Sequence, residues 1–196
     1  MKLIIRPAVL TDAESFLSIY APYVRDTAVS FEYEIPGLEE FRERIRRTLT
    51  RYPWLAAELG GEVVGYAYTG AFNKRAAYDW SAETSVYLRT DCRRQGVGKR
   101  LYQTLEAVSQ AQNVQNLNAC IAVPAGEDPH LTRDSIAFHT RMGYRLAGEF
   151  HQCGYKFGTW YGMAWMEKQI GNHPLEPAPF IPFPELPENT LGRLFR

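Results

Sequence analysis

Hydrophobic and polar positions along the chain follow two periods, one of two residues and one of about 3.6 residues. Alternating or unbroken apolar runs predict strands over residues 2–6, 54–59, 63–71, 78–88, 117–123, 144–153 and 157–168. Apolar positions that recur on one helical face predict helices that begin near residue 11, span 38–51, begin near residue 97 and span 135–142. Strands that alternate with helices and hairpins indicate an α/β fold with a mixed sheet.

Local signals predict where several elements begin and turn. Thr11, followed three residues later by Glu14, forms a capping box, so Thr11 is expected to cap the first helix. The Gly60-Gly61 pair predicts a two-residue hairpin. The last hairpin is expected to turn about Gly154-Tyr155, and residues 28–32 are expected to be extended.

The chain changes character at Gly171. The residues that follow have no hydrophobic period and contain six prolines. We therefore expect a domain over residues 1–170 and a proline-rich tail over residues 171–196. The apolar residues of the tail are expected to pack along the domain; they are Phe180, Ile181, Phe183 and Leu186.

Charge and cysteine content narrow the possible partners and compartments. Lys and Arg number 22 and Asp and Glu number 22, so the net charge favours neither nucleic acid nor anionic membranes as partners. No apolar run approaches the roughly 20 residues that a membrane span needs, and the apolar N-terminal segment is too brief for a signal peptide. Three widely spaced cysteines argue for reduced thiols and a cytoplasmic location.

Two glycines open the helix that begins near residue 97. Gly96 and Gly98 flank Val97, and the apolar positions Val97, Leu101, Leu105 and Val108 define one face of this helix. The first turn of a helix has unpaired N–H groups and a partial positive charge, so it can hold a phosphate. The cations expected to surround the turn are Arg89, Arg93, Arg94, Lys99 and Arg100. The pattern predicts a pyrophosphate site.

An ordinary loop-to-helix connection with solvated arginines is the alternative interpretation of this turn. The segment lacks the third glycine and the position after the first strand that define a dinucleotide-binding fingerprint. It also lacks the Gly-Lys-Ser/Thr ending of a Walker P-loop.

Two side chains near this turn are candidates for acid–base chemistry. Glu83 lies in an otherwise apolar strand, where partial burial would raise the pKa of its carboxyl and suit it to accept a proton from an ammonium group or water. The alternative is an ion-paired residue on a strand edge. His139, on the short helix before Gly143, is a candidate donor of a proton to a departing thiolate, although a lone helical histidine is more often structural.

The loop before the strand of Glu83 contains candidate substrate-binding residues. Arg75 can grip a carboxylate with two parallel hydrogen bonds, which suits an amino-acid substrate, and Tyr78 follows it. An exposed loop cation is the alternative reading of Arg75. No histidine pair has metal-ligand spacing, so no metal is expected.

Several stretches of the sequence carry a family resemblance. Arg93, Gly96 and Gly98 match the Arg/Gln-x-x-Gly-x-Gly/Ala motif of the GNAT acetyltransferases. Within that superfamily the chain resembles the phosphinothricin N-acetyltransferases over about residues 2–168, in the stretches Val29-Ser30-Phe31, Arg51-Tyr52-Pro53-Trp54-Leu55, 61–68, Arg75-Ala76-Ala77-Tyr78-Asp79-Trp80, Glu83-Thr84-Ser85-Val86-Tyr87, Phe138-His139 and Met142-Gly143-Tyr144.

The resemblance implies a fold, a reaction and partners. The fold is the GNAT fold (α/β, or α+β in some schemes), with a mixed central sheet of about seven strands flanked by about four helices. The reaction is transfer of acetyl from acetyl-CoA to the α-amino group of a small glutamate-like acceptor, such as phosphinothricin, methionine sulfoximine or methionine sulfone. Members of the family are commonly homodimers, so a homodimer is expected.

The resemblance also implies roles for particular residues. Glu83 is the general base and His139 supports catalysis, while Phe31, Arg75 and Tyr78 contact the acceptor. The coenzyme is held by backbone groups of Val86, Tyr87, Leu88, Arg93, Arg94, Gln95, Gly96, Val97 and Gly98, with Lys99 and Ser135 beside them.

Two features depart from the family pattern. Thr132 stands where many relatives have an Asn that touches the coenzyme. The loop 125–131 and the segment 151–160 differ from the phosphinothricin-specific enzymes and would border the acceptor, so the natural substrate is left open.

The expected mechanism is direct transfer in a ternary complex. Glu83 deprotonates the acceptor, a backbone N–H at Tyr87 stabilises the developing oxyanion and His139 protonates the thiolate. The alternatives are a GNAT enzyme that acetylates a peptide N-terminus, a polyamine or an aminoglycoside, and a non-catalytic coenzyme-binding or interaction module. Arg75 argues against polycations because it would repel them.

Overall fold

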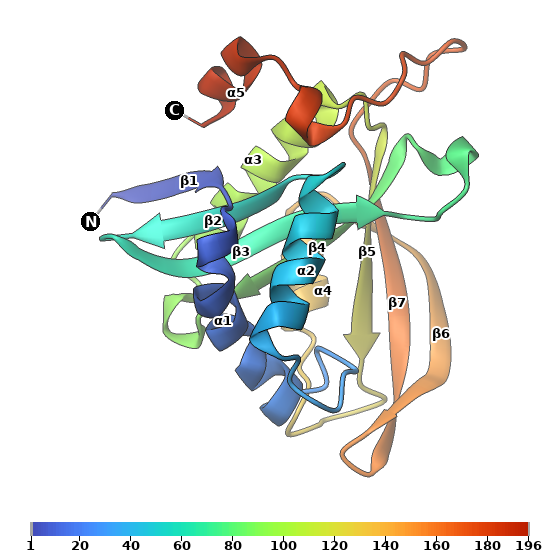
Figure 1. Cartoon of the computed structure of the whole chain (residues 1–196). Helices are drawn as coiled ribbons and strands as arrows, with labels where there is room; N and C mark the ends of the chain where they lie inside the picture. The colour runs from blue at the N-terminus through green and yellow to red at the C-terminus, as the bar shows by residue number, and fades with distance from the viewer. Residues whose placement is uncertain (1, 196) are drawn as a thin grey trace.

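Seven strands form one mixed sheet in the computed structural model, which describes residues 2–195 (Figure 1). The sheet has the order β1-β2-β3-β4-β5-β7-β6, and β4 and β5 are its parallel neighbours, the other pairs being antiparallel. The strands are β1 (Leu3–Pro7), β2 (Trp54–Leu59), β3 (Glu62–Ala71), β4 (Ser81–Leu88), β5 (Asn116–Val123), β6 (Arg145–Lys156) and β7 (Thr159–Gln169). The predicted mixed α/β sheet is confirmed.

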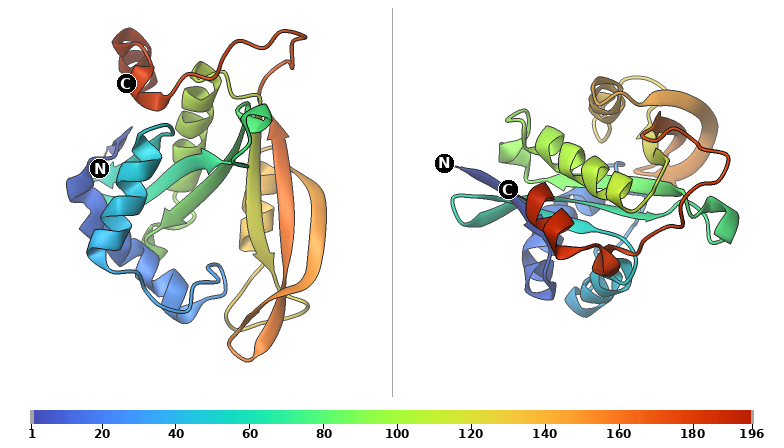
Figure 2. Two further views of the ribbon diagram at one scale, coloured as in Figure 1. Left: turned by 45° about the vertical axis from the view of Figure 1, so that its right-hand side comes forward. Right: turned by 90° about the horizontal axis from the view of Figure 1, so that it is seen from above.

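Helices cover both faces of the sheet, as the view from above shows (Figure 2). One face carries α1 (Ala13–Asp26) and α2 (Leu38–Leu49), and the other carries α3 (Val97–Ala111) and α4 (Asp134–Arg141). A fifth helix, α5 (Glu188–Leu194), packs against α3 near the C-terminus.

The hydrophobic core has two parts, because successive side chains of a strand point to opposite faces of the sheet. Along β2, Trp54 faces the aromatic core under α1 and α2, while the next residue, Leu55, faces the core under α3. Both side chains are buried, at 3% and 0% exposure. A strand buried on both faces needs an unbroken apolar run, which is why residues 54–57 show no alternation of apolar and polar types.

The strands β4 and β5 separate soon after they meet. Their parallel register runs only from Ser81 opposite Asn116 to Glu83 opposite Asn118. Beyond that point β5 remains paired to β7 as far as Val123, and β4 remains paired to β3 as far as Leu88. The sheet therefore opens between its two central strands, and Glu83 is the last β4 residue before the opening.

Several boundaries differ from the predictions. The α1 cap is wrong: Thr11 is exposed, and Asp12 instead accepts the Val9 N–H (2.9 Å) and binds Arg6 (2.7 Å). The last hairpin turns at Phe157-Gly158, where both residues have positive φ, instead of at Gly154-Tyr155. Gly154 stays in β6 because its bare Cα accommodates the Phe31 ring.

Two irregular segments also differ from expectation. Residues 28–32 form bends and loop with no strand pairing, because their polar groups bond to other loops and to Lys156. The C-terminal tail is not wholly irregular, since it contains α5. Its Phe183 and Leu186 are buried against Val108 of α3, so the predicted packing of these two tail residues is confirmed.

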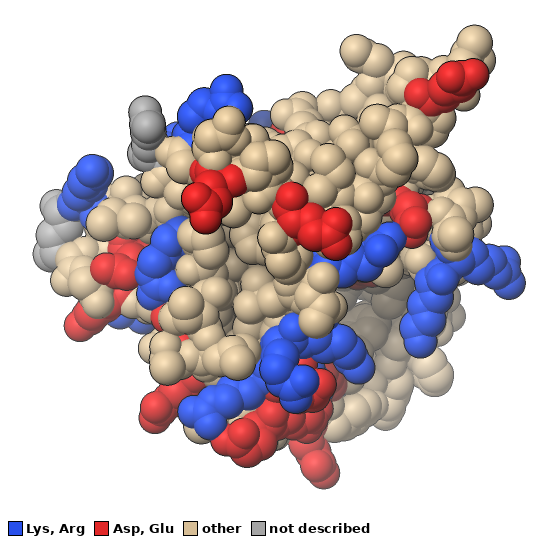
Figure 3. All heavy atoms as spheres, turned by 45° about the horizontal axis from the view of Figure 1, so that its top comes forward, with Lys and Arg blue, Asp and Glu red and all other residues tan. Residues whose placement is uncertain are grey.

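Charged side chains of both signs are interspersed on the face seen in Figure 3, without a continuous field of one sign. On α2 three of the four arginines pair along the helix, with Arg42 to Glu39, Arg44 to Glu40 and Arg46 to Glu43. The charge run on α2 is thus a set of local ion pairs. Among residues 2–195, no helix is long and apolar enough to cross a membrane.

Candidate functional site

A groove enters the sheet where β4 and β5 separate. Its outer part, about 320 Å³ in volume, lies between β4, the start of α3 and α4, and is lined by Val86, Leu88, Arg93, Arg94, Gly96, Gly98, Lys99, Thr132, Ser135, Phe138 and Arg141, among others. A smaller inner pocket shares Val29, Val86 and Ser135 with it. Residues from both faces of the sheet line this inner pocket: Tyr102 and His139 on one side, and Val29 and Cys120 on the other. The opening therefore leads through the sheet.

The start of α3 has the geometry of an anion site. Gly96 caps the helix with φ of +84°, a left-handed conformation that favours glycine. The first intrahelical bond runs from the Arg100 N–H to the Gly96 carbonyl (3.0 Å), so the N–H groups of residues 97–99 precede the helical ladder and have no partner within it. A Cβ at Gly98 would lie 3.3 Å from Leu88 and 3.4 Å from Phe138. Gly98 thus allows the side chains of Leu88 on β4 and Phe138 on α4 to pack against the start of α3.

The cations around this turn have different partners. The Arg93 guanidinium lies 5.1 Å from the centre of the Tyr23 ring, and Arg94 is 3.7 Å from Asp134 and almost fully exposed. Lys99 and Arg141 line the groove. Within residues 2–195, Arg93, Lys99 and Arg141 therefore reach the rim without an ion pair, and Arg94 has only the long, exposed pair with Asp134.

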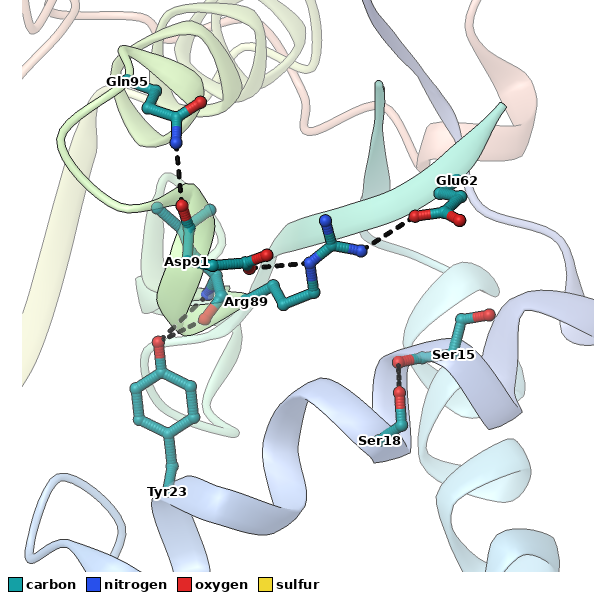
Figure 4. A network of polar contacts seen from close by, with 8 residues as sticks. Ser15, Ser18, Tyr23, Glu62, Arg89, Asp91 and Gln95 are labelled. Atoms are coloured by element: carbon teal, nitrogen blue, oxygen red, sulfur yellow. Dashed lines mark hydrogen bonds and ion pairs between the residues drawn. The ribbon is translucent and has the colours of Figure 1, made fainter. Parts of the chain in front are cut away.

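Figure 4 shows how the loop before α3 is held. The Tyr23 hydroxyl donates to the Leu88 carbonyl (2.6 Å) and accepts the Leu88 N–H (3.2 Å), so both backbone groups of Leu88 are occupied. Arg89 is paired with Glu62 (3.0 Å) and Asp91 (2.7 Å) and faces a separate cavity beside α1, which removes it from the predicted cluster of cations. Gln95 donates its side-chain amide to Asp91 (2.8 Å).

The ladder of β4 decides which backbone groups face the groove. The Arg89 N–H donates to Val64 of the segment paired with β4 (2.9 Å), so alternation directs the N–H of Tyr87 to β3 and that of Val86 to the β5 side. Since β5 has already separated, Val86 has no backbone partner there among residues 2–195. The Tyr87 N–H, the expected oxyanion donor, is therefore directed to β3 and away from the groove, whereas Val86 offers a free N–H. The Tyr87 ring packs on Tyr20 under α1.

Glu83 occupies the point where the two strands part. Burial raises the pKa of its carboxyl above the ordinary 4.5, and no hydrogen bond or ion pair to its side chain is present among the described residues. Its neighbour Thr84 points to the opposite face and donates to the Asn118 carbonyl (3.1 Å). Burial and the nearby Glu83 raise the pKa of the Cys120 thiol to about 12. A desolvated, unpaired carboxylate beside an opening has the character of a general base.

His139 is buried on the other side of the opening. Its Nδ1 donates to the Ser135 carbonyl (2.7 Å), which leaves Nε2 to accept from the Tyr102 hydroxyl (2.9 Å). Burial lowers the pKa of His139 to about 4, so the imidazole is neutral at pH 7. The expectation that a protonated His139 gives its proton to a thiolate is therefore not supported, because the one imidazole proton is held by Ser135.

The three residues expected to bind the acetyl acceptor are divided between the two sides of Glu83. Arg75 and Tyr78 belong to the exposed loop 72–80, which leaves β3 beside the pair Gly70 and Glu83. Phe31 packs against Gly154 and lies near Ala122. Ala122 is four residues beyond Asn118, the β5 partner of Glu83, and on the same face of β5, so the two β5 residues are about 13 Å apart along the strand. The structure does not bring Phe31 into contact with Arg75.

A buried lysine that the sequence analysis missed holds the loop of Phe31. Lys156 is 3% exposed, and its ammonium donates to the carbonyls of Val24 (2.7 Å), Thr27 (2.9 Å) and Ser30 (2.7 Å). Lys156 falls between the two predicted strands, beside the turn expected at Gly154-Tyr155, so its position in the sequence gives no signal of burial. Tyr102 was missed as well, since it lies on the apolar face of α3 and reads as core.

Comparisons with known proteins agree with this geometry. The sequence model of the acetyltransferase (GNAT) domain matches residues 5–165. The chain belongs to the GNAT acetyltransferases, a family of enzymes that use acetyl-CoA, and the family predicted from the sequence is confirmed.

The relatives narrow the class further. The chain is 33% identical over 182 residues to a phosphinothricin N-acetyltransferase of Streptomyces viridochromogenes, covering 93% of this chain and 95% of the relative. It is 33% identical over 178 residues to an L-methionine sulfoximine/L-methionine sulfone acetyltransferase of Pseudomonas aeruginosa, covering 89% and 98%. A crystal structure of a phosphinothricin acetyltransferase from Sinorhizobium meliloti in complex with AcCoA superposes with a TM-score of 0.82 at 30% identity, covering 91% and 94%.

Proposed function

We propose that this enzyme transfers acetyl from acetyl-CoA to the α-amino group of a small glutamate-like amino acid, of the phosphinothricin, methionine sulfoximine or methionine sulfone type. The observation that carries the proposal is the opening between β4 and β5, which begins at the unpaired Glu83 and whose inner pocket shares Val86 and Ser135 with the groove at the start of α3. The two named relatives act on acceptors of this kind according to their names.

The residues present fit the coenzyme. The free carbonyl of Val86 can accept an amide N–H of pantetheine, which leaves the Val86 N–H for the thioester, and the N–H groups of residues 97–99 with Lys99 and Arg94 can hold the pyrophosphate. Ser135 and Thr132 line the same groove. When bound, acetyl-CoA supplies an activated acetyl group as a thioester.

Glu83 removes a proton from the acceptor ammonium, directly or through one water, so that the free amine can attack the thioester carbon. The Val86 N–H donates to the carbonyl oxygen as negative charge develops on it. Arg75 and Tyr78 receive the acceptor's carboxylate and polar side chain on one side of Glu83, and Phe31 limits the pocket on the other.

We assign the Tyr102 hydroxyl, which lines the inner pocket, the role of donor to the departing sulfur. Burial holds the pKa of Tyr102 well above 10.0, so its hydroxyl keeps its proton, and it lines the inner pocket. Tyr102 turns this O–H to the sulfur as negative charge builds there. His139, through the bond from Tyr102 to its Nε2, is a positioning residue for that hydroxyl.

Replacing Tyr102 with Phe is expected to lower kcat on the order of tenfold while the KM for acetyl-CoA changes less than about twofold. The matched control is Tyr144→Phe, since the Tyr144 hydroxyl lies 3.5 Å from the same Thr84 but makes no bond to His139. Steady-state kinetics on both variants provide the test. Equal losses in the two variants would remove Tyr102 from this role.

Cys120 and Cys92 do not support a covalent acetyl-enzyme. A thiol with a pKa of about 12, as at Cys120, contains almost no thiolate at neutral pH, and Cys92 is buried in the core. Sequential kinetics are therefore expected in place of ping-pong kinetics.

A thiol-release assay tests the proposed function. Acetyl-CoA is offered with a panel of methionine sulfone, methionine sulfoximine, phosphinothricin, glutamate, spermidine, an aminoglycoside and an alanyl peptide. Turnover of the first three supports the proposal. Turnover of only the polyamine, the aminoglycoside or the peptide supports another GNAT activity, and no turnover at all supports a binding module.

We also propose a homodimer formed through β6 and β7. β6 is an edge strand and is exposed over most of its length, with Leu146 at 59%, Phe150 at 60% and Trp160 on β7 at 52% exposure. Apolar side chains on a long free edge favour pairing with a second copy. Phe150→Glu is expected to convert a dimer to a monomer in sedimentation velocity, and a wild-type monomer at micromolar concentration would contradict the proposal.

The three free cysteines support a cytoplasmic location.

A further inference from the structure

The C-terminal segment crosses the molecule at a fixed place. Residues 177–183, which we call the strap, are bonded at successive points to the rest of the chain. The Ala178 carbonyl accepts the indole N–H of Trp80 (2.8 Å), the Pro179 carbonyl accepts the Asn113 side chain (2.7 Å), and Ile181 exchanges hydrogen bonds with Gln112. Such a series of bonds orders a proline-rich segment that has no period of its own.

A second link runs from the strap through Arg51. The Arg51 guanidinium lies 4.3 Å from the centre of the Phe180 ring and forms an ion pair with Asp79 (2.8 Å). The Phe183 N–H also donates to the Arg51 carbonyl (2.9 Å). A cation held between an aromatic face and a carboxylate connects the two groups that it touches.

Both links end on the same loop. Asp79 and Trp80 form the stem by which the loop 72–80 returns to β4, and the same loop carries Arg75 and Tyr78. Residues 73–78 are exposed, and the other aromatic contact that leaves the loop is the packing of Phe72 on Trp165. On the β4 side, the Trp80 carbonyl also accepts the backbone N–H groups of Gln115 (2.8 Å) and Asn116 (3.1 Å). The strap therefore supplies the side-chain anchors of Asp79 and Trp80 on a loop that has little packing of its own.

We propose that the strap positions the loop 72–80 for the amino-acid acceptor, so that the C-terminal segment determines how tightly the acceptor binds. The part of the inference that concerns the acceptor rests on the proposed function. The strap makes no contact with the coenzyme groove, whose lining residues belong to α1, β4, α3, α4 and neighbouring loops. Loosening the strap should thus weaken acceptor binding and leave acetyl-CoA binding unchanged.

The experiment uses three variants of the full chain. Trp80→Phe removes one hydrogen bond to the strap and keeps an aromatic ring, and Phe180→Ala removes the ring on which Arg51 lies. Leu191→Ala is the matched control, because it trims a C-terminal side chain that packs on the α3 side of the segment, away from the loop. Hydrogen exchange of residues 72–80 and the KM of both substrates are measured for each variant.

Trp80→Phe and Phe180→Ala are expected to speed exchange in residues 72–80 by three- to tenfold and to raise the acceptor KM by a similar factor, with kcat and the KM for acetyl-CoA within twofold of wild type. Leu191→Ala should change neither quantity. Unchanged exchange in both strap variants would overturn the inference, as would faster exchange with an unchanged acceptor KM. Should no amino acid be acetylated, the proposed function fails on that result alone. The exchange measurement still decides whether the strap holds the loop.

Discussion

Glu83→Gln is expected to lower kcat on the order of 10²-fold or more at neutral pH, with little change in the KM for acetyl-CoA. Gln has the size of Glu but cannot accept the proton of the acceptor ammonium, and no carboxylate that could replace Glu83 lines the inner pocket among the described residues. Steady-state kinetics with methionine sulfone measure the change. A loss of only two- or threefold would exclude Glu83 as the base. Glu62→Gln, at an exposed carboxylate beside Arg89, serves as the control.

The same variant carries a pH signature. Because burial raises the pKa of Glu83, kcat/KM of the wild type should fall with decreasing pH through a value above 4.5, and this fall should be absent from Glu83→Gln.

Ionisation of Glu83, which activity requires, is expected to decrease the stability of the fold. A buried carboxyl with a raised pKa destabilises the fold once the pH exceeds 4.5, since the unfolded chain ionises more readily. Glu83→Gln should therefore be more stable than wild type at pH 7 and equal to it below pH 4.5.

Lys156→Met is expected to lower the free energy of unfolding by about 3 kcal/mol. Met keeps the length of the side chain but leaves the carbonyls of Val24, Thr27 and Ser30 without their buried donor. Urea denaturation measures the loss, and Lys2→Met, at an exposed lysine, is the control. Because these carbonyls belong to the end of α1 and the loop of Phe31, the acceptor KM should rise as well. A loss below about 1 kcal/mol would show that water satisfies the carbonyls equally well.

The regular elements could be predicted because their signals are local. The spacing of Val97, Leu101, Leu105 and Val108 identified α3, and Gly60-Gly61 identified the first hairpin, where both glycines have positive φ. The last hairpin was misplaced because Gly154 resembles a turn residue. It is instead a strand residue, and a side chain at this position would collide with the Phe31 ring. Gly154 and Phe31 are more than a hundred positions apart in the sequence. Such long-range contacts leave no local pattern.

In the site, too, features with a local sequence signal could be predicted, and features that depend on long-range contacts could not. Glu83 and the Gly96–Gly98 turn could be found because a carboxylate in an apolar strand and a glycine-rich helix start are unusual in their own neighbourhoods. The charge state of His139 could not be found, since it depends on burial and on the bonds to Ser135 and Tyr102. The choice of Val86 over Tyr87 as the free N–H likewise required the register of β4 with β3.

The central claim is that the start of α3 and the opening between β4 and β5 direct a thioester to Glu83. The most direct test is a crystal structure of the enzyme with acetyl-CoA and methionine sulfone. The account predicts the pyrophosphate on the N–H groups of residues 97–99 and the thioester oxygen on the Val86 N–H. It also predicts the acceptor nitrogen within a direct or one-water hydrogen bond of Glu83. A pyrophosphate bound elsewhere, or a Glu83 carboxylate on the far side of the sheet from the acetyl group, would contradict it.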